Sequence, residues 1–324
     1  MLMSVLLFAV GLILLIKGGD WFVDGATGLA KRFNLPDIVV GATVVSIGTT
    51  LPEVMVSTTG ALQGSGAMAY GNAIGYIICN TALIAAISIT CNPGPVNVKS
   101  MKTPAIFFFM SAALYCLAAY GLGTFPRWMG FVMLTIFVIY MIMTVRNGLK
   151  NPDESSDEDE EGGKPKQLWQ ELLLLVIGAA VIAVGADLLV EHGQVIAIGL
   201  GVPETVVALL FVALGTSLPE LVTTITSLKK GRASLGVGNV IGANIFNLVL
   251  VSGVAVSLAP FDVPCENLLL DTGLNLSLVF DIPVMLGVMS LMIFPALASK
   301  KLGRWQGILL LGIYVAFCVC QFML

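Results

Sequence analysis

The segment LPDIVVGATVVSIGTTLPE (35–53) has a second copy in the same chain, VPETVVALLFVALGTSLPE (202–220). A second matched pair follows, in which GNAIGYIICN (71–80) corresponds to GNVIGANIFN (238–247). In both pairs the second copy begins 167 residues after the first. A constant offset without a gap indicates an internal repeat. The chain is therefore expected to consist of two similar halves.

The amino-acid composition places this repeat in a lipid bilayer. Of 324 residues, 57% are apolar and only 11% are charged, whereas soluble domains keep about 25% of their residues charged. A spanning helix takes about 20 mainly apolar residues. Ten stretches meet this requirement, at roughly 2–24, 37–62, 70–91, 102–122, 127–147, 168–192, 202–228, 236–259, 278–298 and 304–323. The sequence thus predicts an all-α integral membrane protein with ten transmembrane helices.

The basic residues alternate between the predicted loops. Fourteen of the 16 Lys and Arg residues lie in loops that follow odd-numbered spans. The positive-inside rule then puts these loops in the cytoplasm and both termini outside, in the cell (plasma) membrane. Each half has five spans, an odd number, so the second half enters the bilayer from the opposite face. Two inverted five-helix repeats are typical of secondary transporters, whose binding site lies at the midplane.

Three parts of the chain follow from this reading: a first repeat (1–147), a linker (148–167) and a second repeat (168–324). The linker contains NPDESSDEDEEGG (151–163), which is too polar and charged to pack, so we expect a cytoplasmic tether. Its acidic residues could also bind Ca²⁺ as a regulatory patch, although the run lacks the glycine-centred spacing of an EF-hand loop. The six cysteines form no CxxC pair, so no zinc or disulfide framework and no cofactor is expected.

Two glutamates, Glu53 and Glu220, stand at equivalent positions deep within predicted spans. An ionisable side chain there costs at least about 2.5–3.5 kcal/mol, so it needs a partner or a purpose. No Lys or Arg lies nearby in sequence, and two carboxylates that met at the repeat interface would repel each other in a low dielectric. A bound cation removes this repulsion. Ca²⁺ in particular takes about 6–8 oxygen ligands.

The residues around each glutamate supply further oxygen atoms. The proline before each glutamate removes a backbone donor and breaks the helix, which frees carbonyl groups one turn earlier. Such carbonyls are tolerated at membrane depth where they line a cavity, so the carbonyls of Thr49 and Thr216 are candidate ligands. Asn80 and Asn247 add neutral amide oxygens from the following spans. The alternative is that the glutamates are protonated and hydrogen-bonded in a motif that only kinks the helix. The duplication favours the cation site.

These motifs resemble the sodium/calcium exchangers of the cation/Ca²⁺ antiporter superfamily over the whole chain. The resemblance rests on the two GT[ST]LPE segments, the GNVIGANIFN segment, the acidic linker and FDIPVML (280–286). It implies ten helices, alternating access and a cluster of four sites that holds one Ca²⁺ or several Na⁺. By position, it implies a central Ca²⁺ site at Glu53, Glu220 and the Thr49 and Thr216 carbonyls, with flanking Na⁺ positions at Ser46, Thr50, Ala213 and Ser217.

The chain departs from the pattern of this family in three places. Members usually read Gly-Ser-Asn in both repeats, but Tyr76 and Ala243 replace the two serines, which the resemblance assigns to outer sodium positions. Tyr76 is also much larger than serine and could fill one of these positions. Asn247 is neutral where some relatives carry aspartate. The central divalent site is therefore expected to be intact, whereas the sodium sites differ from the family pattern.

The leading hypothesis for function is a secondary active antiporter that exchanges Ca²⁺ for Na⁺ by alternating access. The lost serines leave open an alternative in which H⁺ replaces Na⁺ as the coupling ion. A cation channel is less favoured, because an inverted repeat with broken helices is typical of transporters. Enzyme activity is not expected, since the GxGD signature of intramembrane aspartyl proteases is absent. The expected partners are Ca²⁺, Na⁺ and the lipid bilayer, with no nucleic acid and no protein partner.

Overall fold

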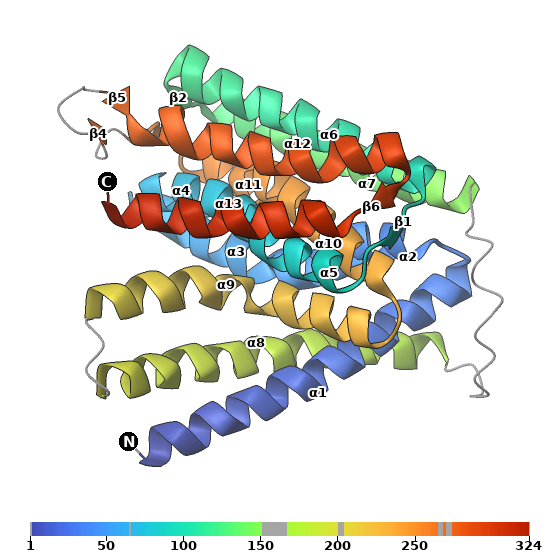
Figure 1. Ribbon diagram of the computed structural model, residues 1–324. Helices are drawn as coiled ribbons and strands as arrows, with labels where there is room; N and C mark the ends of the chain where they lie inside the picture. Colours follow the sequence, from blue (N-terminus) through green and yellow to red (C-terminus); the bar gives the residue numbers. More distant parts are fainter. Residues whose placement is uncertain are drawn as a thin grey trace.

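The computed structural model describes residues 2–64, 66–150, 167–199, 204–264, 268–269 and 274–323. Nearly all of these residues lie in helices, and the long helices run side by side (Figure 1). Within the described ranges, eight helices are long and apolar enough to cross a membrane. The number becomes nine if the bent pair Asp37–Leu51 and Glu53–Leu62 counts as one span. The fold is therefore nearly all-helical, as the apolar stretches predict, and the count of ten spans stays a prediction.

The first half contains a series of long helices with π-helical turns (η) inserted in them. One of these turns in each half begins at an asparagine, and the two asparagines, Asn80 and Asn247, are equivalent. π-Helical turns are frequent at functional sites. The elements are α1 (Leu2–Phe33), α2 (Asp37–Val40), η1 (Gly41–Val45), α3 (Ser46–Leu62), α4 (Gly66–Cys79), η2 (Asn80–Ala85), α5 (Ala86–Cys91), α6 (Val98–Cys116), η3 (Leu117–Leu122) and α7 (Arg127–Lys150).

The second half repeats much of this order. Its helical elements are α8 (Leu168–Gly199), α9 (Glu204–Lys229), α10 (Ala233–Phe246), η5 (Asn247–Val251), α11 (Ser252–Leu258), η7 (Ser277–Asp281), α12 (Ile282–Ser299) and α13 (Arg304–Met323). Three short antiparallel pairs join loops: β1 (Gly94–Pro95) with β6 (Lys301–Leu302), β2 (Thr124–Phe125) with β3 (Phe261–Asp262), and β4 (Leu268–Leu269) with β5 (Leu274–Asn275). Two of these pairs, β1–β6 and β2–β3, tie the first half to the second.

Some boundaries differ from the sequence prediction. Helix α1 continues to Phe33 rather than ending near residue 24, because the polar residues of its last turns are compatible with a helix. It ends where Asn34 adopts a left-handed conformation (φ 51°), a common C-terminal cap. The axis bends by 48° between Leu51 and Glu53, and α9 runs through Pro219 without ending. The prolines thus lie within helices rather than terminating them.

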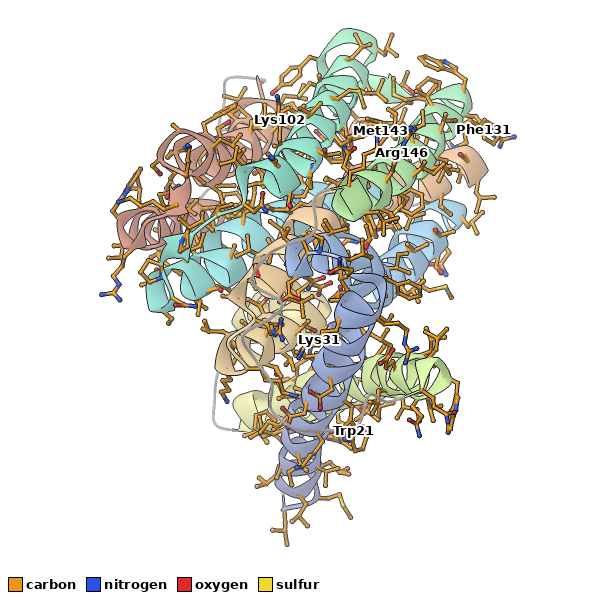
Figure 2. The ribbon with its side chains drawn as sticks, turned by 90° about the vertical axis from the view of Figure 1, so that its right-hand side faces the viewer. Trp21, Lys31, Lys102, Phe131, Met143 and Arg146 are labelled. Atoms are coloured by element: carbon orange, nitrogen blue, oxygen red, sulfur yellow. The ribbon has the colours of Figure 1, made fainter. Side chains whose placement is uncertain are left out.

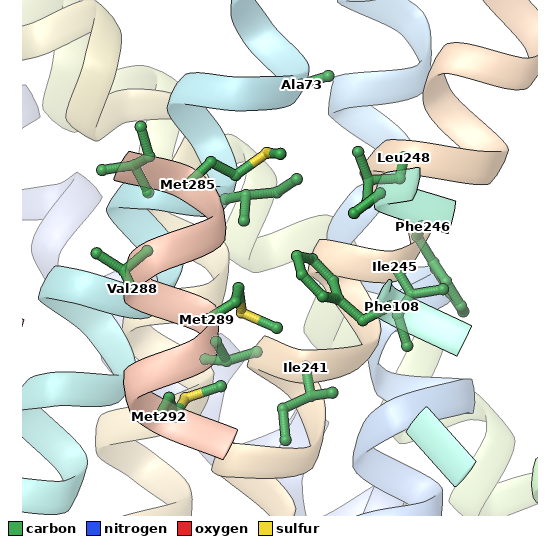
Figure 3. Packing of buried hydrophobic residues seen from close by; sticks show 14 of the residues in the cluster. Ala73, Phe108, Ile241, Ile245, Phe246, Leu248, Met285, Val288, Met289 and Met292 are labelled. Carbon is green, nitrogen blue, oxygen red and sulfur yellow. The ribbon is translucent and has the colours of Figure 1, made fainter. Parts of the chain in front are cut away.

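Two kinds of packing hold the helices together. Helices α1 and α8 lie next to each other along one side of the molecule (Figure 1). Their contact is close, because an added Cβ on Gly11 or Gly185 would lie 2.9 Å from the carbonyl oxygen of the other glycine. The rest of the molecule surrounds a large apolar core. Figure 3 shows Met289 of α12 facing Phe108 of α6 in this core, close to Ile241 of α10.

One end of the molecule is rich in basic residues. Figure 2 views the molecule from the right-hand side of Figure 1, and Lys31, Lys102 and Arg146 all lie on this side. They stand near the end of α1, the start of α6 and the end of α7. We call this side of the molecule the basic end.

Candidate cation-binding site

Glu53 of α3 and Glu220 of α9 come together inside the protein. Both side chains are fully buried, and they are near enough to interact electrostatically. Among the described residues, neither carboxylate has a hydrogen-bond partner of acceptable geometry, and neither takes part in an ion pair. Buried polar groups nearly always have partners, so four unpaired carboxylate oxygens need an explanation. Two negative charges side by side would be neutralised by one divalent cation.

Tyr76 of α4 lies against this pair. Its side chain is buried, and it interacts electrostatically with both Glu53 and Glu220 and with the side chain of Asn80. Its hydroxyl has no hydrogen-bond partner of acceptable geometry among the described residues. A phenol oxygen therefore stands at the carboxylate pair, where it can contribute an oxygen ligand or a proton.

Asn80 and Asn247 each begin a π-helical segment, η2 and η5 respectively. Both are fully buried, and both side-chain oxygens lack a partner within the described ranges. The amide nitrogen of Asn247 donates to the Ala243 carbonyl (3.0 Å), which leaves its oxygen available. Asn244 differs, because its nitrogen donates to the Thr81 hydroxyl (2.7 Å) and so ties α10 to η2. The π-helical turns therefore present amide oxygens from both halves.

The flanking hydroxyl groups divide into two kinds. Thr50 and Ser217 are buried, and their hydroxyls have no hydrogen-bond partner in the part of the chain that the structure describes. Thr49 interacts with Glu220, and its hydroxyl also lies 3.3 Å from the side-chain oxygen of Asn239. Ser46 is fully buried and contacts Asn239 as well. The side chains of Ala213 and Thr216 lie outside the described residues.

The donor set of this site consists of oxygen atoms. No group of three or more His, Cys, Asp and Glu side chains that could hold a metal ion occurs among the described residues, so neutral oxygens must supply the rest of any coordination shell. Carboxylate, amide, hydroxyl and carbonyl oxygens suit hard cations such as Ca²⁺, whereas soft metals prefer thiolate or imidazole. Cys79 is a free thiol nearby, next to Ser217, but it is buried as a small hydrophobe. The chemistry of the site is thus that of a hard cation.

The helices pack closely on the side of the basic end. There α10 crosses α2 and η1 so closely that an added Cβ on Gly41 would collide with the Leu235 carbonyl, and one on Gly238 with the Ile38 carbonyl. The equivalent of Gly238 in the first half is Gly71. An added Cβ on Gly71 would meet nothing within 4 Å among the described residues. Equivalent glycines thus have different surroundings, and the two halves do not pack identically.

Sequence reasoning missed one buried contact of this site. Asn239 of α10 is fully buried and lies against both Ser46 and Thr49. The signal was present in the sequence, because Asn72 and Asn239 are the second residues of the paired GN segments. Neither was singled out, since an asparagine after a glycine has many structural roles.

The comparison with known protein families agrees with this chemistry. The apolar helices and the family match together define a multi-pass membrane protein. The family described as "Sodium/calcium exchanger protein" matches residues 3–146 and 171–323. This match covers most of both halves, so the chain belongs to the sodium/calcium exchanger family. The family resemblance inferred from the GT[ST]LPE and GN motifs is thereby confirmed.

Individual relatives cover nearly the whole chain. A membrane protein of Methanocaldococcus jannaschii is 35% identical over 95% of this chain and 94% of its own length. The sodium/calcium exchanger MaX1 of Methanosarcina acetivorans is 29% identical, with 98% of each protein covered. The solved structure of the sodium-calcium exchanger NCX_Mj soaked without Na⁺ and Ca²⁺ is 31% identical, with a TM-score of 0.79 over 99% of both chains. The chain therefore has the overall architecture of that exchanger.

Proposed function

We propose that this protein is a secondary active antiporter that exchanges Ca²⁺ for Na⁺ across the cell membrane by alternating access. The observation that carries the proposal is the buried pair Glu53 and Glu220, which has no cationic partner among the described residues. Such a pair is costly unless a cation binds, and its two charges match one Ca²⁺ or two Na⁺. Competition of these ions for the same carboxylates couples their movements.

In this proposal the ligands come from equivalent positions of two inverted five-helix repeats (1–147 and 168–324). Ca²⁺ is held by Glu53, Glu220 and the carbonyls of Thr49 and Thr216. Asn80 and Asn247 add amide oxygens, which have no hydrogen-bond partner among the described residues. The flanking Na⁺ positions are Ser46, Thr50, Ala213 and Ser217. The ten-span arrangement counts α2 to α3 as one span and α9 as another.

The positive-inside rule orients the molecule. The basic end then faces the cytoplasm, the termini lie outside, and the linker (148–167) is a cytoplasmic tether. The close packing of α10 on α2 and η1 at the basic end supports a conformation closed toward the cytoplasm. The space around Gly71 on the opposite side supports access from outside. The relatives MaX1 and NCX_Mj, which are named as sodium/calcium exchangers, support the choice of ions.

Ion flux into vesicles tests the proposal. Purified protein is reconstituted into liposomes loaded with Na⁺ and diluted into Na⁺-free buffer that contains ⁴⁵Ca²⁺. We expect uptake that depends on the Na⁺ gradient and disappears in Glu53→Gln and Glu220→Gln. Glu191→Gln, at an exposed position of α8, is the matched control and should transport normally. Uptake that persists in both site variants would rule out this site, and no uptake by the parent protein would rule out Ca²⁺ exchange.

Tyr76 favours one alternative, in which H⁺ is the coupling ion. A phenol beside two carboxylates is a proton-bearing group where the family pattern has serine, and Ala243 removes the second hydroxyl. In the same liposomes, an outward-directed proton gradient without Na⁺ would then drive ⁴⁵Ca²⁺ uptake. The absence of such uptake, with the Na⁺-driven flux intact, would exclude this alternative.

A further inference from the structure

We propose that Asn72 and Asn239 exchange hydrogen-bond partners during the transport cycle and thereby determine which end of the site is closed. The two asparagines occupy equivalent positions in α4 and α10, yet they have different partners in this structure. The inference rests on the proposed alternating access, in which each repeat takes up in turn the packing that the other repeat shows. It assigns a positioning role to two residues that are not part of the ligand set.

Asn239 binds across the interface between the two halves. The Ser46 hydroxyl lies 2.8 Å from the Gly41 carbonyl in its own half and 2.9 Å from the Asn239 backbone carbonyl across the interface. The Asn239 side-chain oxygen lies 3.3 Å from the hydroxyls of both Ser46 and Thr49. These contacts join α3 to α10 between the glutamates and the closely packed basic end, where Gly238 packs on Ile38. Asn239 therefore holds the closed side of the site together.

Asn72 binds within its own half. Its side-chain nitrogen donates to the Ser57 hydroxyl (2.8 Å), which joins α4 to α3. The side chain is only partly buried, whereas Asn239 is fully buried. The next residue toward the N-terminus, Gly71, is exposed and would tolerate an added Cβ. Asn72 is therefore bonded within its own half, on the side of the site where the helices pack less closely.

A second hydrogen-bond partner for Asn239 is also present in its own half of the chain. The equivalent of Ser57 in the second half is Thr224, which is buried with a hydroxyl that has no hydrogen-bond partner among the described residues. Thr224 packs on Gly236, because an added Cβ there would lie 3.2 Å from its Cα. Gly236 precedes Asn239 by three residues, or about 4.5 Å along a helix axis. Because a helical side chain points toward the N-terminus of its helix, the Asn239 side chain can reach toward Thr224 from this position, as Asn72 reaches Ser57.

The exchange is not symmetric in this chain. In the opposite conformation Asn72 would face the equivalents of Ser46 and Thr49, which are Ala213 and Thr216. Alanine lacks the hydroxyl, so the second closed state has one cross-repeat hydrogen bond fewer. A neutral hydrogen bond changes an equilibrium by about two- to tenfold. The chain is therefore biased toward the conformation that is closed at the basic end.

The test uses two equivalent substitutions that should act in opposite directions. Ser57→Ala removes the bond that Asn72 makes here and should favour the opposite conformation by about two- to tenfold. Thr224→Ala removes a partner used only in the opposite conformation and should favour the present one. Thr224→Ser keeps the hydroxyl and should cause no shift. Ser111→Ala, which removes a buried hydroxyl bonded within its own helix, controls for the loss of a hydroxyl.

Two readouts report the conformation without requiring ion transport. In a background without native cysteines, the Gly71→Cys thiol is labelled by a membrane-impermeant maleimide. Labelling should slow in Ser57→Ala and stay equal or quicken in Thr224→Ala. Hydrogen–deuterium exchange of residues 235–242 should rise in the first variant and fall in the second. Ala213→Ser, which supplies the missing hydroxyl, should shift both readouts in the same direction as Ser57→Ala.

The outcomes separate this inference from the proposed function. If Ser57→Ala and Thr224→Ala shift both readouts in the same direction, or shift neither, the partner exchange is wrong even when the parent protein still exchanges Na⁺ for ⁴⁵Ca²⁺. If the parent transports no Ca²⁺ but the two variants shift in opposite directions, the exchange of partners stands and the assignment of the ions fails.

Discussion

Replacing Glu53 with glutamine tests the energetic role of the carboxylate pair. The substitution keeps the size of the side chain and removes one of two buried charges that have no protein cation among the described residues. Removing one charged group from a buried pair of opposite charges, here a carboxylate and its bound ion, costs about 2–5 kcal/mol of binding free energy. With a factor of ten per 1.4 kcal/mol, Ca²⁺ affinity should fall by about 30-fold to several thousand-fold. The Ca²⁺ affinity of Glu220→Gln should fall by a similar factor, because the two positions are equivalent.

Equilibrium binding measures this effect without transport. Purified variants are titrated with ⁴⁵Ca²⁺ by dialysis, and size-exclusion chromatography confirms that each remains folded. Glu53→Asp retains the charge and should lose less affinity than Glu53→Gln. The exposed control Glu191→Gln should bind like the parent. If both glutamine variants at the pair bind within threefold of the parent, the carboxylates do not carry the divalent site and the reasoning from burial and charge is refuted.

Three further substitutions test other parts of the structure. Tyr76→Phe removes one oxygen from the site and should weaken Ca²⁺ binding by roughly two- to tenfold, and unchanged binding would show that the phenol is not a ligand. Gly238→Ala places a methyl group in a close helix crossing and should lower the free energy of unfolding by about 1–3 kcal/mol. Gly71→Ala is its matched control and should cost much less, so equal losses would contradict the asymmetric packing. Arg232→Gln breaks a part-buried ion pair with Asp37 (3.3 Å) between the two halves, and it should increase hydrogen exchange at the basic end, whereas no change there would show that this pair does not help to close it.

The carboxylate pair could be predicted from the sequence because its signal is chemical. A glutamate in an apolar span is costly anywhere in the bilayer, and its duplication at a constant offset indicates a shared site. The structure indeed buries Glu53 and Glu220 and brings them together. The constant offset alone shows that the two positions are equivalent, without any knowledge of how the helices pack. The composition likewise predicted the helical membrane fold before any contact was known.

Other features depend on packing and left little trace in the sequence. The π-helical turns at Asn80 and Asn247 arise where several helices meet, and no local residue pattern distinguishes them from an α-helix. Equivalent glycines such as Gly71 and Gly238 have identical sequence signals, but only Gly238 lies in a close crossing. The two glycines differ because the structure describes one conformation of a molecule with two similar halves. Their identical motifs give no sign of this difference, which depends on how the helices pack.

Competition between Na⁺ and Ca²⁺ for the purified protein tests the central claim most directly. Ca²⁺ bound at the carboxylate pair is titrated with Na⁺ at fixed pH, and the residual ⁴⁵Ca²⁺ is measured. The account predicts that Na⁺ displaces Ca²⁺ with a Hill slope above one, because more than one Na⁺ replaces each divalent ion. If Na⁺ leaves Ca²⁺ bound at every concentration while protons displace it, the protein is not a sodium-coupled exchanger.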